Sequence, residues 1–310
     1  MAASPRSLSQ ERFKGWPAWV LRQGPLTLCV VPDVGGRLMG MAYGGRELCF
    51  THPALEGKTF DGDMRQWPAL CGEWGFPLWG GGKTWVGPES AWPAGAPHRD
   101  LDSLPWQVRD TWLDAQSMGI EVHSVVCSAS GLQLTRRLTL NAHTEGGASQ
   151  WTIDHSLRNT GSTPVRCGIW DVLMLLRPAR ARVPLSSPIT GPALAALPGK
   201  KSLAALRAQG TLRDNPTEAL VHCTHSDDFK CGFASADGCI EVDFGPGAPR
   251  YTRRSATDMS QPYAHGLPLE VFNAPVLNYF EVETHSPLRT LGAGEVLRFA
   301  VVEALMTLCT

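Results

Sequence analysis

The sequence predicts an all-β protein whose strands form one continuous double-sheet domain. Short runs of alternating or β-branched apolar residues recur along the whole chain, and Gly, Pro, Asp or Asn separates them. Segments with helical periodicity are scarce, which argues against a regular alternation of strands and helices. The Pro/Gly-rich stretches at 67–112 and 178–199 carry too many apolar residues to be flexible linkers. We therefore expect an N-terminal tail at residues 1–14 and a single domain over residues 15–310.

The expected strands follow one another at spacings typical of antiparallel hairpins. Ser130-Gly131 and Ala236-Asp237-Gly238 are typical of tight turns between such strands. One or two short helices are expected within residues 194–209, with a break at Pro198-Gly199. The strands with the clearest pattern are predicted at 26–31, 37–43, 120–127, 132–140, 151–157, 165–176, 219–224, 240–244, 277–283 and 296–304.

Composition limits the kind of partner that the chain can have. It has 28 basic and 29 acidic residues, so its charge gives no general attraction to nucleic acid or to a membrane surface. No apolar run approaches the ~20 residues that span a bilayer, and the first residues lack the apolar core of a signal peptide. The nine cysteines are scattered without a Cys-x-x-Cys pair, which indicates reduced, mostly buried thiols. We expect a cytoplasmic protein that binds a small, nearly neutral molecule and uses no cofactor.

Tryptophans are concentrated in one part of the sequence. Seven of the eleven fall between Trp67 and Trp112, in a segment that also holds six prolines and seven glycines. A segment so rich in helix and strand breakers is expected to form ordered loops that present large flat side chains. Each tryptophan ring can bury roughly 150–250 Å², and its face suits the flat, weakly polar faces of sugars. The segment therefore predicts a sugar-binding surface.

Two motifs have alternative interpretations. Gly82-Lys83-Thr84 has the form of the end of a phosphate-binding loop, but Pro77 stands where that loop needs its first glycine. Lys83 is better explained as a donor to a sugar hydroxyl or to an anionic group. His222-x-x-His225 suggests a metal site, but residues three apart on a strand point to opposite faces. No metal is expected.

The segment 278–287 carries two glutamates at strand spacing. Alternation places Glu281 and Glu283 on one face about 7 Å apart, which suits a cleft in which one serves as a general base. The alternative is a solvated strand face with two ordinary surface glutamates. His98, inside the tryptophan-rich segment, can titrate near neutral pH and serve as an acid, or it can simply cap a loop.

Short segments along the chain occur in the same order as in a known family. They lie at 31–38, 43–48, 81–88, 98 with 105–108, 154–161, 283–287 and 291–295, and they include Val31-Pro32-Asp33-Val34-Gly35-Gly36-Arg37-Leu38, Asn159-Thr160-Gly161 and Glu283-Thr284-His285-Ser286-Pro287. In this order they resemble the galactose mutarotase-like superfamily, which includes aldose 1-epimerases and glucose-6-phosphate 1-epimerases. The resemblance implies a β-supersandwich: two large, mainly antiparallel sheets with a sugar-binding cleft on one concave face.

The resemblance also implies roles for individual residues. Glu283 takes the position of the family's catalytic base, although Glu281 could take that place instead. Where the family has the histidine that protonates the ring oxygen, this chain has Trp170-Asp171. The acid would therefore be His98, or Asp171 with its pKa raised by burial. The residues expected to position the sugar are Lys83, Trp85, Glu89, Trp92, Arg99, Trp170 and Glu281.

The activity that the resemblance implies is that of an aldose 1-epimerase-type isomerase acting on a monosaccharide or a sugar phosphate. A base takes the proton of the C1 hydroxyl, an acid protonates the ring oxygen, and the open aldehyde rotates and recloses. One alternative is a carbohydrate-binding protein that kept the cleft and lost the acid. Another is a lyase or hydrolase of an acidic oligosaccharide, for which the chain lacks a region large enough for a companion catalytic domain.

Overall fold

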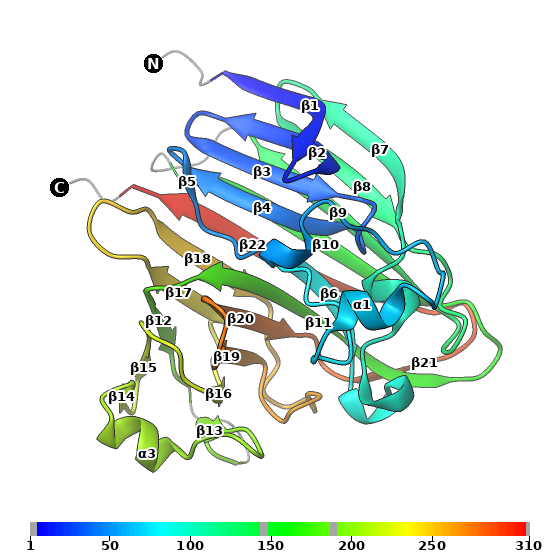
Figure 1. The fold of residues 1–310 in the computed structure, drawn as a ribbon. Helices are drawn as coiled ribbons and strands as arrows, with labels where there is room; N and C mark the ends of the chain where they lie inside the picture. The colour runs from blue at the N-terminus through cyan, green and yellow to red at the C-terminus, as the bar shows by residue number, and fades with distance from the viewer. Residues whose placement is uncertain (1–4, 143–147, 187–190, 308–310) are drawn as a thin grey trace.

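The computed structural model describes residues 5–142, 148–186 and 191–307. Across these residues the strands form two large antiparallel sheets that lie one behind the other in Figure 1. The all-β sandwich predicted from the sequence is confirmed. None of the helices within these ranges is long and apolar enough to cross a membrane.

The first sheet contains 12 strands within the described residues. Its central part places β6, β11, β20, β19 and β16 side by side, although these strands come from distant parts of the sequence. In spatial order the strands are β1 (Arg6–Phe13), β2 (Trp16–Gln23), β3 (Leu26–Val31), β4 (Arg37–Tyr43), β6 (Gly82–Gly87), β11 (Val165–Leu176), β20 (Tyr279–His285), β19 (Leu269–Asn273), β16 (Phe229–Phe233) and β13 (Leu194–Ala196), with β5 (Arg46–Glu47) beside β4 and β21 (Arg289–Leu291) beside β11.

The second sheet has 10 strands in the same part of the chain and covers one face of the first. Its spatial order is β14 (Leu212–Asn215), β15 (Glu218–Cys223), β12 (Ala179–Pro184), β17 (Cys239–Asp243), β18 (Arg250–Ser255), β22 (Val296–Met306), β10 (Ser149–Asn159), β9 (Leu132–Asn141), β8 (Ser117–His123) and β7 (Gln107–Leu113). The helices are short: η1 (Pro53–Leu55), α1 (Trp67–Cys71), η2 (Glu89–Ala91), η3 (Pro93–Gly95), α2 (Arg99–Asp102) and α3 (Leu203–Ala208).

The main hydrophobic core fills the space between the two sheets. Leu173 of β11, Val282 of β20 and Ile153 of β10 are among its buried members. The outer face of β11 is buried as well, because side chains from the segments before and after β6, among them Phe50, Phe76 and Trp92, pack against it. Several tryptophans of these segments, Trp79 among them, therefore lie inside the molecule rather than on a free surface.

The glycine run before β6 lets the chain approach its neighbours closely. Gly80 and Gly81 have φ values of +104° and +68°. A Cβ atom on Gly80 would lie 2.4 Å from the carbonyl oxygen of Phe50, and one on Gly81 would lie 2.6 Å from that of Leu38. Only glycine fits both the backbone conformation and the space. The run therefore allows close packing against the neighbouring segments.

Some expected boundaries are wrong. Residues 6–13, expected in a tail, form β1, which pairs with β2 from Arg6 opposite Gln23 to Phe13 opposite Trp16. Its sequence is mostly polar because β1 is an edge strand that gives few side chains to the core. In the segment 194–209, the first residues form β13, and only α3 is helical, capped by the Ser202 side chain.

Two further outcomes concern the strand limits and the cysteines. β20 begins and ends two residues later than the predicted 277–283, so it includes His285. The eight cysteines within the described residues are all buried free thiols, as the sequence indicated, and Cys309 lies outside those residues.

Candidate functional site

The candidate site lies on the outer face of the first sheet, where β6, β11, β20, β19 and β16 run side by side. Val172 of β11 lies opposite both Lys83 and Glu283, and Glu283 in turn lies opposite Glu270. Because side chains alternate along each strand, these residues share the outer face with Lys230 of β16. The backbone register therefore gathers charges from distant segments in one place.

Glu283 is fully buried at the centre of this face. The indole Nε1–H of Trp170 donates to Glu283 Oε2 at 2.7 Å, and the Lys230 ammonium donates to the same oxygen at 2.9 Å. The other oxygen, Oε1, has no hydrogen-bond partner within the described residues. Burial raises the pKa of Glu283 to about 8, although Lys230 works against the rise. At neutral pH this carboxyl group therefore holds its proton most of the time.

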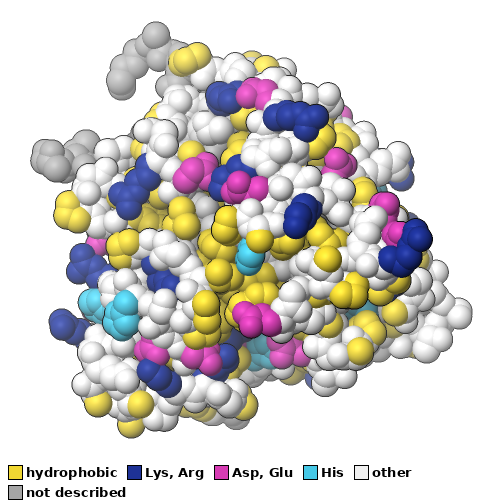
Figure 2. Space-filling view, viewed as in Figure 1, with side chains coloured by type: hydrophobic (Ala, Val, Ile, Leu, Met, Phe, Trp, Pro, Cys, Tyr) yellow, Lys and Arg dark blue, Asp and Glu magenta, His cyan; other side chains and the backbone are white. Residues whose placement is uncertain are grey.

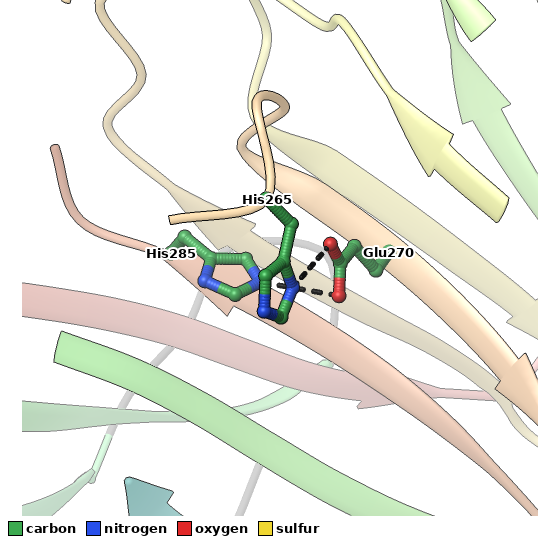
Figure 3. A group of neighbouring side chains, drawn as sticks. All are labelled: His265, Glu270 and His285. Atoms are coloured by element: carbon green, nitrogen blue, oxygen red, sulfur yellow. Dashed lines mark hydrogen bonds and ion pairs between the residues drawn. The ribbon is translucent and has the colours of Figure 1, made fainter. Parts of the chain in front are cut away.

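Glu270 lies beside Glu283 and behaves in the opposite way. Lys230 Nζ lies 2.8 Å from Glu270 Oε2, the His265 Nδ1 atom lies 2.8 Å from Oε1, and His285 Nε2 lies 3.3 Å from Oε2 (Figure 3). Burial works to raise the pKa of Glu270, but Lys230 and the two imidazoles outweigh it and hold the pKa well below its usual value. Glu270 is therefore a carboxylate, and Lys230 binds an ionised and a protonated glutamate at once.

His265 gives this cluster a free nitrogen. With its Nδ1 bonded to Glu270, the ring is oriented so that Nε2 has no hydrogen-bond partner in the described part of the chain. The closest charged atom to Nε2 is Glu89 Oε2 at 3.9 Å, and the Glu89 side chain is about half exposed, at 54%. A carboxylate that fixes the tautomer of a histidine is a common way to prepare the second nitrogen for proton transfer.

His265, Glu270 and His285 also have the donor types of a metal centre. One ligand atom from each lies within 4.8 Å of the others, and two histidines with one carboxylate are a known set for zinc or iron. The Lys230 ammonium, however, already lies 2.8 Å from the Glu270 carboxylate, and its neighbours Glu270 and Glu283 raise its pKa in spite of burial. A permanent positive charge in that place would repel a divalent ion. We interpret the group as a lysine-centred ion cluster.

Aromatic rings cover the outer face around Glu283. Trp92 stacks on Trp170 with ring centroids 5.7 Å apart and planes 14° apart, and Trp85 meets Trp170 edge-on at 5.0 Å. Lys230 lies over the Trp170 ring at 4.6 Å. In the space-filling view, hydrophobic side chains gather near the middle of the face shown, next to acidic and histidine side chains (Figure 2). Trp92 itself is half-buried on the loop after β6 and covers part of the Trp170 ring.

Lys83 and Glu281 form a second ion pair on the same face. The Lys83 ammonium lies 3.1 Å from Glu281 Oε1 and 3.8 Å from the centroid of the Trp85 ring, and both charged side chains are buried. Burial lowers the pKa of Lys83, and Glu281 opposes that effect. Glu281 and Glu283 thus share a face, as alternation predicted, and neither is an ordinary surface glutamate.

Asp171 points the other way, into the space between the sheets. Its carboxylate contacts the Arg253 guanidinium, lies 3.9 Å from Arg136 Nη2 and lies 3.5 Å from His155 Nε2. Burial works to raise the pKa of Asp171, but these basic groups hold it well below its usual value. Asp171 lies on the opposite face from Trp170 and has a lowered pKa, so we no longer assign it as the general acid.

His98 and Arg99 are not brought to Glu283 either. His98 precedes α2, and its Nδ1 lies 3.6 Å from Cys127 Sγ in a cavity that includes neither Glu283 nor Trp170. The Arg99 guanidinium lies 3.6 Å from Asp100 and over the Trp67 ring at 5.9 Å. Neither residue therefore belongs to the outer-face cluster around Glu283.

The sequence interpretation missed four residues of the cluster: Lys230, His265, Glu270 and His285. Lys230 and Glu270 are single charges inside the short apolar strands β16 and β19, which were not among the predicted ranges. A lone charge in such a strand is a weak signal, because the same pattern fits an exposed face. His285 lies within the motif Glu283-Thr284-His285-Ser286-Pro287, but the strand expected at 277–283 ended before it.

Comparison with known proteins extends these observations. No protein-family model matches the chain, and none of the curated proteins matches it by sequence. Solved structures do match. A provisionally assigned aldose 1-epimerase of Klebsiella pneumoniae matches with a TM-score of 0.65 at 13% identity, over 98% of this chain and 84% of that one. A galactose mutarotase-like protein of Clostridium acetobutylicum matches with a TM-score of 0.60 at 10% identity, over 98% and 99% of the two chains.

A provisionally assigned aldose 1-epimerase of Escherichia coli K12 also matches, with a TM-score of 0.55 at 13% identity, over 94% of this chain and 99% of that one. These structures share the two-sheet architecture along nearly the whole chain. The protein therefore has the galactose mutarotase-like fold that the sequence resemblance implied. At such low identities the match defines the fold, and the chemistry has to be argued from the site itself.

Proposed function

We propose that this protein is carbohydrate-active and works as an aldose 1-epimerase-type isomerase that opens and recloses a sugar ring by proton transfer. The observation that carries the proposal is the pair Glu270 and Glu283, held by Lys230, with one carboxyl ionised and the other protonated. Neighbouring titratable groups whose pKa values are driven apart are characteristic of acid–base catalysts.

The roles follow from the protonation states. Glu283 begins with its proton and donates it to the ring oxygen during opening. His265, held by Glu270, accepts the proton of the C1 hydroxyl at its free Nε2 atom. During closure the two groups exchange roles, because the reverse step removes the proton from the former ring oxygen. Glu283 therefore acts as a base only during ring closure, whereas the resemblance implied that it is the base during ring opening.

The remaining outer-face residues would hold the sugar. Trp170, Trp85 and Trp92 provide stacking surfaces, and the Lys83–Glu281 pair provides hydrogen-bonding groups at one side. Glu89 lies at the rim beside His265. Arg99 is not part of this surface, so we no longer assign it to sugar binding.

Anomer-exchange NMR on common aldoses and sugar phosphates tests the proposal. The wild-type protein is expected to exchange one aldose faster than buffer, and Glu283→Gln to reduce the rate by about 100-fold or more, since it removes a proton donor. Exchange is expected to slow as the pH rises through about 8, where Glu283 loses its proton. Glu73→Gln, at an exposed site, is the matched control and should change nothing. A rate no faster than buffer for every sugar would contradict the proposal.

One observation favours a second candidate, a carbohydrate-binding protein without turnover. Trp170 stands where the resemblance places the acid histidine, and Trp92 already lies on its ring. This candidate predicts saturable sugar binding by calorimetry together with no acceleration of exchange. Binding with exchange supports the isomerase, and the absence of both would contradict a carbohydrate role for this face.

A further inference from the structure

Two adjoining cavities lie away from the candidate site. They have volumes of about 300 Å³ and 150 Å³, and both are lined by Pro93, His98 and Ala129. Neither is lined by Glu283 or Trp170. They form a separate feature, and their chemistry is independent of the sugar-ring opening proposed for the outer face.

The larger cavity contains a paired thiol and imidazole. Cys127 Sγ lies 3.6 Å from His98 Nδ1, within hydrogen-bonding distance for sulfur, and both residues line the cavity. The Cys127 backbone is fixed by hydrogen bonds with Leu132 and Gly131, each 2.8 Å long. The pair is therefore held in place by the connection between β8 and β9.

A second contact fixes the imidazole side of the pair. Ser128, next to Cys127, donates its backbone N–H and its hydroxyl to Asp100 Oδ2 at 2.9 Å and 2.6 Å. Asp100 is in α2, which His98 precedes, so these bonds join the two segments that carry the pair. Burial lowers the pKa of His98, against the opposing charge of Asp100. The imidazole is therefore neutral at neutral pH and able to accept a proton.

The other described cysteines have a different environment. Within residues 5–142, 148–186 and 191–307, Cys127 is the cysteine whose sulfur contacts an imidazole. Burial raises the pKa of the remaining seven thiols, which are Cys29, Cys49, Cys71, Cys167, Cys223, Cys231 and Cys239. Cys127 is as buried as these thiols, at 2% exposed, and differs from them in that its sulfur contacts an imidazole that lines the same cavity. A thiol next to a base can be activated as a nucleophile.

We propose that Cys127 is a reactive thiol, with His98 as its base, that forms mixed disulfides with small carboxylate-bearing disulfides entering this cavity. Arg99 and Asp100 both line this cavity, 3.6 Å apart. Asp100 also accepts two hydrogen bonds from Ser128, and the Arg99 side chain is 39% exposed, so the guanidinium is the group left open to an anionic partner. The thiol proton passes to His98, the sulfur attacks one sulfur of the disulfide, and the S–S bond breaks. The departing thiolate takes the proton from His98, so the products are the protein mixed disulfide and one free thiol.

Reaction of the folded protein with 5,5′-dithiobis(2-nitrobenzoate), a carboxylate-bearing disulfide, tests this proposal through the absorbance of the released thiolate. The protein carries Cys309→Ser, so that only described cysteines respond. We expect a fast phase of one equivalent that disappears in Cys127→Ser and slows at least about tenfold in His98→Gln, since a base is lost. Cys71→Ser is the matched control: Cys71 also lines a cavity, of about 310 Å³, but contacts no described imidazole, and its loss should leave the fast phase unchanged.

A second, neutral reagent distinguishes an effect of the Arg99 charge from an effect on access to the cavity. Arg99→Ala should slow the reaction with the carboxylate-bearing disulfide and leave the rate with neutral iodoacetamide unchanged. A fast phase that persists in Cys127→Ser, or that has the same rate in His98→Gln, would overturn the proposal. Equal slowing of both reagents by Arg99→Ala would overturn the preference for an anionic partner. Circular dichroism of each variant confirms that the fold is retained.

Discussion

Asp171 and Glu283 lie on neighbouring strands of one sheet, both are shielded from solvent, and they have opposite protonation states. Asp171 faces the second sheet and is 1% exposed, while Glu283 faces outwards and is 0% exposed. Burial by itself works to raise the pKa of each carboxyl group. The difference between them has to come from their neighbours.

The inner cluster, formed by Asp171, Glu303, Arg253, Arg136 and His155, surrounds Asp171 with basic groups, whereas burial raises the pKa of Glu303. Arg253 bonds both Asp171 and Glu303, and Arg136 and His155 add further basic groups around Asp171. The outer cluster has a single ammonium, Lys230, for both Glu270 and Glu283. The number of basic groups next to each carboxyl therefore accounts for the opposite pKa shifts of Asp171 and Glu283. The inner cluster holds the sheets together, whereas the outer one retains a proton that can be transferred.

The first prediction concerns a substitution that removes the central cation of the inner cluster. Arg253→Met leaves Asp171 and Glu303 without their shared cation, so we expect a loss of about 3–5 kcal/mol in the free energy of unfolding, measured with urea. Arg254→Ala is the matched control, because the next residue along β18 is exposed and should change the stability by less than about 0.5 kcal/mol. Arg253→Lys should fall between the two, since a lysine keeps the charge and loses the forked geometry. A loss below about 1 kcal/mol in Arg253→Met would mean that the cluster is not needed to hold the sheets.

The second prediction distinguishes Glu283 from Asp171 by the pH dependence of the free energy of unfolding. The pKa of Glu283 is about 8 in the folded protein, against the ordinary 4.5 of an unfolded chain. Its contribution to stability is therefore fully present below pH 4.5 and is lost as the pH rises towards about 8, at roughly 1.4 kcal/mol per pH unit. Relative to Glu283→Gln, the wild type should lose about 3 kcal/mol between about pH 5.5 and 7.5 in urea unfolding.

Asp171→Asn provides the contrast over the same pH range. The folded pKa of Asp171 is below its unfolded value, so its contribution is present above the unfolded pKa and is lost only as the pH falls through the folded one. The difference in stability between wild type and Asp171→Asn should therefore be constant between about pH 5.5 and 7.5. A constant difference for Glu283→Gln as well would show that Glu283 is ionised like Asp171, and would remove the proton donor from the proposed mechanism.

Part of this arrangement could be predicted from the sequence. The strands at 26–31, 37–43 and 165–176 lie where the apolar patterns placed them. Alternation along a strand correctly put Glu281 and Glu283 on one face. The same rule puts Trp170 and Asp171 on opposite faces, so it already excluded Asp171 as a partner of a glutamate next to Trp170.

The rest depends on contacts between distant segments. Lys230 and Glu270 become a site only because β16 and β19 lie beside β20, and nothing within either strand indicates which strand is its neighbour. Their surroundings also come from other segments, since Lys230 lies over the Trp170 ring of β11 and Glu270 contacts His265 on the loop before β19. His98 meets Cys127 in the same way, across a separation of 29 residues. Local sequence patterns predict where strands form and which side chains share a face, but not which strands lie side by side or which faces come into contact.

The third prediction concerns the ring that covers the outer cluster. Trp92→Ala removes a ring that stacks on Trp170 and an indole N–H that donates to the Val86 carbonyl at 2.6 Å. We expect a small loss of stability, about 1–2 kcal/mol, because an aromatic pair and one hydrogen bond contribute amounts of that order. Trp170 should become accessible to acrylamide in fluorescence quenching.

The sign of the effect on sugar affinity decides what Trp92 does. If Trp92 occupies the place of the sugar on Trp170, its removal should tighten binding in calorimetry, because the ligand no longer has to displace a ring. If Trp92 contacts the sugar directly, as the sequence interpretation had it, binding should weaken. Trp112→Ala is the control, since that half-buried ring lies on β7 of the other sheet and its loss should leave affinity unchanged. Trp92 stacks on Trp170, whose indole N–H donates to Glu283, while Asp171 faces the space between the sheets. Removal of Trp92 should therefore affect the Glu283 cluster and leave the inner one as it is.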